Sequence, residues 1–215
     1  MRWVRSVPEL GRPDLVVLPG SKNTRGDLDW FQAGGLAGAV GRSGAAVVAV
    51  CAGLQMVGGA IDDPDGVEGA SGGDKGLGWL PVTTDFRGDK VLDRPAGAAA
   101  AGPGAGADVG GYRIHHGRVA AGPDALTWLV DATGESLGWW DGEQVVGTTL
   151  HGLFESDAFR TGVLAWAAAR AGKRWTSGGL DFAATRSGRL DRIADLLEAH
   201  LDLDRLGDLI VEAAP

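Results

Sequence analysis

The sequence predicts an α/β fold, with a doubly wound and mostly parallel sheet flanked by helices. Residues 15–18 and 45–50 are short, uninterrupted apolar runs rich in β-branched side chains, which is typical of strands buried on both faces. Each run ends in small residues and is followed by a stretch suited to a helix, so strands and helices alternate along the chain. Ligands of such sheets bind at the carboxyl ends of the strands.

The first elements follow in that order. A strand over residues 15–18 is closed by a Pro-Gly pair, and a polar loop leads into one helix expected over residues 23–40. The apolar members of this helix are Leu28, Trp30, Phe31 and Leu36. The strand over residues 45–50 comes next and ends at a turn that begins with Cys51.

From residue 76 onward, strand and turn patterns dominate the chain. Extended segments are predicted over residues 78–86, 111–119 and 144–150. Residues 93–110 are rich in Ala and Gly and too poor in large apolar side chains to pack well. We expect this stretch to be a flexible surface insertion.

The C-terminal part is predicted to be helical from Phe159. One apolar helix face there consists of Leu190, Ile193, Leu196, Leu197 and His200. We therefore expect one domain over residues 1–165 and a helical tail over residues 166–215 that packs on it.

Composition excludes several classes of function. The chain has 215 residues, is 44% hydrophobic and carries a formal charge of −8, which argues against nucleic acid or an anionic membrane surface as the main partner. No apolar run approaches the length of a membrane span, and the N-terminus lacks the apolar core of a signal peptide. The single cysteine permits no internal disulfide, so the cytoplasm is the expected compartment.

That cysteine, Cys51, stands where a buried strand is expected to meet a helix. A helix N-terminus offers partial positive charge and free N–H groups, and both favour the thiolate, which is the nucleophilic form. The alternative is an inert buried cysteine, because free cysteines are among the most buried residues.

His151 follows a strand of the same β-branched type and is our candidate base for the thiol. The other histidines are weaker candidates. His115 and His116 are adjacent, so they point to opposite faces of a strand and cannot readily chelate one metal ion. For His200, on the apolar helix face, a packed or solvated role is expected. No metal site is predicted.

An acyl-transfer site also needs donors for an oxyanion. The backbone N–H groups of Ala52, directly after the cysteine, and of Ser21, in the loop after the first strand, suit this role. The alternative for the Ser21 loop is a solvated turn. The sequence has neither a P-loop nor a dinucleotide-binding glycine pattern.

Eight segments together resemble the glutaminase domain of the cobyric acid synthase family, in the family's order. They are LPGSKNT (18–24), DLDW (27–30), VCAGLQMVG (50–58), IDDPDGVEG (61–69), GLGWLPVTTDF (76–86), GYRIHHGRV (111–119), GTTLHGLFESDAFR (147–160) and RLDRIADLLEAHLDLDRL (189–206). This family belongs to the class I, cysteine-dependent glutamine amidotransferases, which have a flavodoxin-like α/β fold.

The resemblance implies roles for individual residues. Cys51 matches the nucleophile that attacks the side-chain amide of L-glutamine, and His151 matches the general base and acid. Gln55 and Gly20 match substrate-binding positions, and Gly20 together with Ser21 matches the loop that contributes to the oxyanion hole. Tyr112, Ile114, His115 and Gly117 match a segment that faces the ligand or partner domain.

Three positions depart from the family's pattern. Leu153 stands two residues after the histidine, where many class I enzymes have a glutamate, so a Cys–His dyad is expected; Glu155 is a less favoured candidate to orient the imidazole. Ala52 replaces a more usual glycine and could crowd the backbone donor. Arg113 replaces a more usual acidic residue.

The family also places an ATP-dependent synthetase domain and an earlier strand before the region matched here. We therefore expect an N-terminally truncated copy or one subunit of a split enzyme, with ATP and Mg used by the synthetase part and no cofactor bound by this chain. The expected function is ammonia supply for amidation of corrinoid carboxylates in cobalamin biosynthesis. Alternatives are a non-catalytic assembly module and an amidotransferase subunit for a cell-wall precursor; homo-oligomerisation is left open.

Overall fold

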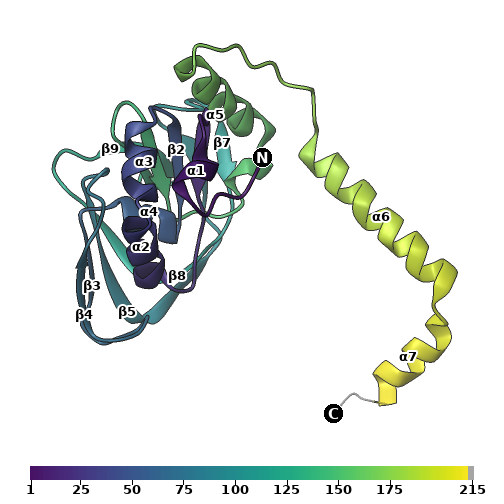
Figure 1. Ribbon diagram of the computed structural model, residues 1–215. Coiled ribbons are helices and arrows are strands. Elements are labelled where there is room, and N and C mark those ends of the chain that lie inside the picture. Colours follow the sequence, from purple (N-terminus) through teal and green to yellow (C-terminus); the bar gives the residue numbers. More distant parts are fainter. Residues whose placement is uncertain (213–215) are drawn as a thin grey trace. The chain divides into compact units, whose positions relative to one another are not determined.

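The computed structural model describes residues 1–212 and divides into two units, Met1–Thr176 and residues 177 onward (Figure 1). The first unit contains helices α1 (Val7–Leu10), α2 (Thr24–Ala33), α3 (Leu36–Arg42), α4 (Ala52–Val57) and α5 (Asp157–Arg170), and the 3-10 turn η1 (Leu153–Glu155). The second unit contains α6 (Phe182–His200) and α7 (Leu203–Glu212).

A seven-stranded sheet forms the centre of the first unit. Its strands, in spatial order, are β1 (Leu15–Leu18), β2 (Ala46–Val50), β11 (Val145–Thr148), β10 (Ser136–Trp140), β9 (Leu126–Asp131), β6 (Ala96–Ala99) and β7 (Asp108–Gly110). β1, β2 and β11 are parallel, and the remaining pairs are antiparallel. The predicted α/β class is confirmed, but the sheet is mixed rather than mostly parallel, because short turns join β9 to β10 and β10 to β11.

A second sheet of four strands extends from the first. Its order is β4 (Gly72–Lys75), β3 (Ala60–Asp63), β5 (Val82–Asp93) and β8 (Arg113–Ala121). β5 and β8 form a long antiparallel pair, with a register shift between Phe86 and Val91. This ribbon matters for function because it brings Gly117 of β8 against Gln55 of α4.

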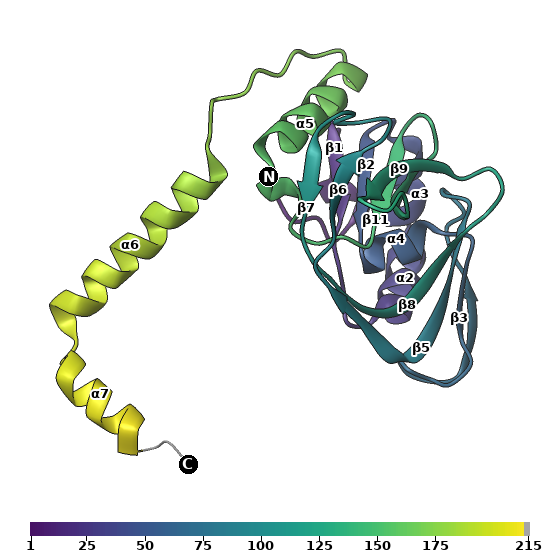
Figure 2. The same ribbon diagram turned by 180° about the vertical axis from the view of Figure 1, so that it is seen from behind.

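The core lies on both faces of β2. Val47 and Ala49 pack with Phe31, Leu36 and Leu54 from α2, α3 and α4. Val48, on the opposite face, belongs to a cluster with Trp128, Phe159 and Val163, two of which come from α5. Figures 1 and 2 show helices α2, α3 and α4 on one side of the sheet and α5 on the other. The continuous apolar run of β2 therefore marks burial on both faces, as predicted.

Residues 93–110 correct the expectation of a flexible surface insertion. They contribute β6 and β7 to the sheet, and Ala99 and Val109 are buried. The small side chains allow close approach: a Cβ on Gly97 would lie 1.8 Å from the carbonyl oxygen of Val130. The small side chains of this segment are therefore what allows β6 to pack closely against β9.

The bounds of two secondary-structure elements also differ from prediction. The helix expected over residues 23–40 is two helices, because Gly35 adopts φ 73° between α2 and α3. The extended segment expected from residue 78 begins as a strand only at Val82. The division between units falls after Thr176, whereas α5 runs through residue 165, where a domain boundary was expected. Packing of the tail on the domain stays a prediction.

Candidate functional site

Cys51 occupies the turn between β2 and α4. Its φ of 54° and ψ of −110° make it the one non-glycine residue with positive φ among residues 1–212. Such a conformation costs about 1–3 kcal/mol and persists where the surrounding structure enforces it. The Cys51 N–H donates to the carbonyl of Thr148 at the end of β11 (2.8 Å), and the side chain is 6% exposed. The turn thus fixes the thiol at the carboxyl edge of the sheet.

His151 follows β11 at the same edge. Its backbone exchanges two hydrogen bonds with Tyr112, of 3.0 and 2.8 Å. The two rings stack, with centroids 5.1 Å apart and an interplanar angle of 11°. These contacts hold the imidazole, whose Nε2 is buried without a hydrogen-bond partner among the described residues.

Gly20, two residues beyond β1, lies beside both side chains. A Cβ on this glycine would lie 3.5 Å from Cβ of Cys51 and 3.1 Å from Cε1 of His151. The parallel strands β1, β2 and β11 are neighbours, so the residues that follow them are gathered at one edge. The structure therefore brings Gly20, Cys51 and His151 together.

The charge state of the pair differs from the one expected. Burial raises the pKa of Cys51, and the charge of Glu68 raises it further, while a hydrogen bond with the backbone of Ala52 lowers it. Burial lowers the pKa of His151. The thiol pKa was expected to be lowered; it is raised instead, because burial outweighs the hydrogen bond with the Ala52 backbone. The thiol holds its proton, and the imidazole can accept one.

Of the predicted oxyanion donors, Ala52 directly follows Cys51, and Ser21 lies in the loop after β1. Ala52 is fully buried, and its backbone bonds to the Cys51 sulfur. In the other loop, the Ser21 hydroxyl accepts from the N–H of Asn23 (2.9 Å), and the Asn23 side chain caps α2. This loop is ordered by its own hydrogen bonds; donation by the Ser21 N–H to an oxyanion stays a prediction.

Gln55 lies one turn along α4 from Cys51 and is 2% exposed. Its Oε1 accepts from the hydroxyl of Thr24 (3.1 Å), whereas its Nε2 has no partner among the described residues. The N–H of Thr24 donates to the carboxylate of Glu68 (2.9 Å). A hydrogen-bonded chain thus connects the predicted substrate-binding glutamine to an acidic side chain.

Sequence reasoning missed Thr24, Glu68 and Asp63, which positions the backbone of Glu68. The buried carboxylate of Asp63 accepts from the N–H groups of Val67 (2.7 Å) and Glu68 (3.0 Å). Only membership in the matched segments 18–24 and 61–69 pointed to these residues. Their contacts join positions far apart in the chain.

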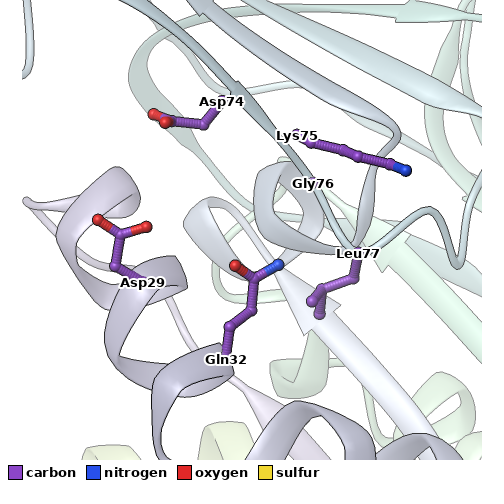
Figure 3. Close-up of a pocket in the computed structure, with 6 residues that line it drawn as sticks. All are labelled: Asp29, Gln32, Asp74, Lys75, Gly76 and Leu77. Atoms are coloured by element: carbon purple, nitrogen blue, oxygen red, sulfur yellow. The ribbon is translucent and has the colours of Figure 1, made fainter.

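Several other features lie apart from the pair. An open hollow of about 500 Å³ between α2 and β4 is lined by Asp29, Gln32, Asp74, Lys75, Gly76 and Leu77 (Figure 3). His200 is exposed on α6. Leu153, at the position where many class I enzymes have a glutamate, is buried in the core. Within residues 1–212, no cluster of side chains suits a metal ion, and no helix has the length and apolar character needed to cross a bilayer.

Comparison with known proteins adds independent information. The model of the CobB/CobQ-like glutamine amidotransferase domain matches residues 1–159. A cobyric acid synthase of Saccharopolyspora erythraea is 41% identical over 220 residues, which cover 100% of this chain and 41% of that protein. A cobyric acid synthase of Nocardia farcinica is 42% identical over 235 residues, which cover 100% of this chain and 43% of that protein. The chain thus spans about 40% of the length of these relatives.

Solved structures show the same fold. A crystal structure of a glutamine amidotransferase aligns with a TM-score of 0.53 and 14% identity, over 79% of this chain and 85% of that one. A putative GMP synthase protein from Thermoplasma acidophilum gives a TM-score of 0.53 and 15% identity, over 77% and 79% of the two chains. At such identities the likeness concerns the fold alone.

Proposed function

The chain belongs to the CobB/CobQ-like glutamine amidotransferase domain family, and on that premise we propose that it releases ammonia from L-glutamine for amidation of a corrinoid in cobalamin biosynthesis. One observation carries the proposal: the single cysteine, on a strained turn, and an imidazole both lie against Gly20. A thiol and a neutral imidazole at the carboxyl edge of a sheet are the groups that acyl transfer requires.

In the proposed reaction, the thiol of Cys51 gives its proton to His151 as the sulfur attacks the carboxamide carbon of glutamine. The N–H groups of Ala52 and Ser21 stabilise the oxyanion, and one such donor contributes about 3–4 kcal/mol. His151 then protonates the amide nitrogen, the C–N bond breaks, and ammonia leaves. Water, deprotonated by the same imidazole, hydrolyses the thioester to glutamate and regenerates the thiol.

The second half of the reaction is assigned to a synthetase domain or subunit. Amidation requires activation of a corrinoid carboxylate by ATP and Mg, and the sequence has no P-loop motif. We place both partners in the cytoplasm, where a free catalytic thiol stays reduced.

Glutamate release tests the proposal. The full chain is combined with the synthetase part of one of the relatives, and glutamate formed from glutamine is measured. We expect Cys51→Ala and His151→Ala to lose activity, and His116→Ala, a matched histidine change on a half-buried side chain, to keep it.

Turnover by Cys51→Ala at the wild-type rate would refute the mechanism. Absence of turnover in the wild type, despite stable association with the synthetase part, would replace it with the non-catalytic assembly role.

A further inference from the structure

A second histidine, His115, lies close enough to His151 for the two charges to interact. It is on β8, and its Nε2 is buried without a partner among the described residues, like Nε2 of Gln55 and Nε2 of His151. Buried polar atoms are normally satisfied, so a group of three beside one thiol indicates a surface shaped for a polar ligand.

Gly117 locates His115 relative to Gln55. A Cβ on Gly117 would lie 2.4 Å from Nε2 of Gln55, so the backbone of β8 is in direct contact with that side chain. The carbonyl of the same glycine lies 2.7 Å from Nδ1 of His115. His115 and His151 are also close enough for the charge of one to act on the other.

The contact with Gly117 fixes the tautomer of His115. A carbonyl oxygen only accepts, so Nδ1 carries the hydrogen of a neutral ring. Burial and the nearby charges of Arg113 and Arg118 lower the pKa of His115, which keeps the ring neutral at physiological pH. Nε2 therefore carries a lone pair and acts as a hydrogen-bond acceptor, which needs an N–H or O–H donor.

Glutamine offers such a donor at the end remote from its reacting carboxamide. We infer that His115 is a substrate-positioning residue whose Nε2 accepts a hydrogen bond from the α-ammonium group of glutamine. The inference rests on the proposed function. The negative charge of Glu68, which acts on the thiol of Cys51, adds to the attraction for a cation at this site.

The experiment measures how well glutamine protects Cys51 of the full chain from iodoacetamide. His115→Asn keeps a donor near the position of Nδ1 but loses the acceptor, whereas His115→Gln keeps an acceptor near the position of Nε2. The control is His116→Asn, because His116 makes the same kind of contact, Nδ1 to the carbonyl of Arg87 (3.0 Å), but this hydrogen bond is exposed and Nε2 of His116 is not among the buried atoms without a partner.

We expect His115→Asn to raise the half-protecting concentration of glutamine about tenfold or more, and His115→Gln and His116→Asn to raise it less than about threefold. Protection by the monoamide of glutaric acid, which lacks the amino group, should be equal in all variants, as should the alkylation rate without ligand.

Equal loss of protection by both ligands, or unchanged protection by glutamine in His115→Asn, would overturn the inference while leaving the proposed function standing. Failure of glutamine to protect the wild type would refute both.

Discussion

A methyl group on Gly20 is expected to separate the thiol from the imidazole without disturbing the fold. The Cβ of Gly20→Ala would lie 3.1 Å from Cε1 of His151, whereas carbon atoms pack best at about 3.5–4.0 Å. The imidazole must therefore shift by about 0.5 Å or more. Because a misplacement of about 1 Å can cost about a hundredfold in rate, we expect kcat/KM for glutamine to fall between about tenfold and a hundredfold.

Stability should hardly change, because Gly20 is exposed and its φ is not positive. The assay is glutamate release with the synthetase part supplied, and the melting temperature of each variant should stay within about 2 °C of the wild type. Gly88→Ala is the matched control, since a Cβ there meets nothing within 4 Å. If Gly20→Ala and Gly88→Ala are equally active, the reaction does not occur beside Gly20.

Three further predictions follow from the same contacts. Cys51→Gly should be more stable to urea than Cys51→Ala by about 1 kcal/mol or more, because glycine accepts φ 54° without strain; equal stabilities would show that the turn stores no strain. The pKa values of His115 and His151 are lowered from 6.5, so the unfolded chain binds protons more readily and the folded state should lose stability as pH falls below about 6.5. In the double variant His115→Gln/His151→Gln, the free energy of unfolding measured in urea should depend less on pH over this range. Asp63→Ala should cost about 1–3 kcal/mol in urea unfolding by leaving the N–H of Glu68 without its acceptor, and a wild-type midpoint would contradict the network.

The central strands could be predicted from sequence because their signal is local. Residues 15–18 are β1, and residues 45–50 contain β2, as expected from uninterrupted apolar runs. β9 and β10 gave no comparable signal, because their pairing depends on partners across the sheet. The prediction for residues 93–110 failed for a related reason, since the backbone of Gly97 packs closely against the carbonyl of Val130, a contact that the local sequence does not reveal.

In the candidate site, too, residues with a local sequence signal could be predicted, and residues that depend on distant contacts could not. Cys51 and His151 could be identified because each directly follows a buried strand. Glu68 could not, because its contact with Thr24 joins residues 44 positions apart. The pKa of the thiol was predicted in the wrong direction, since the degree of burial is set by the whole fold and not by the adjacent helix.

The hydrogen bond from Cys51 to Thr148 has an evolutionary consequence. Although 100 positions separate sulfur and imidazole along the chain, the geometry between them depends on the register of two adjacent strands, β2 and β11. Insertions and deletions in the surface turns that connect the other strands leave that geometry intact. A slip of one residue in β11, by contrast, would turn His151 to the opposite face, so the geometry of the pair requires this one strand register.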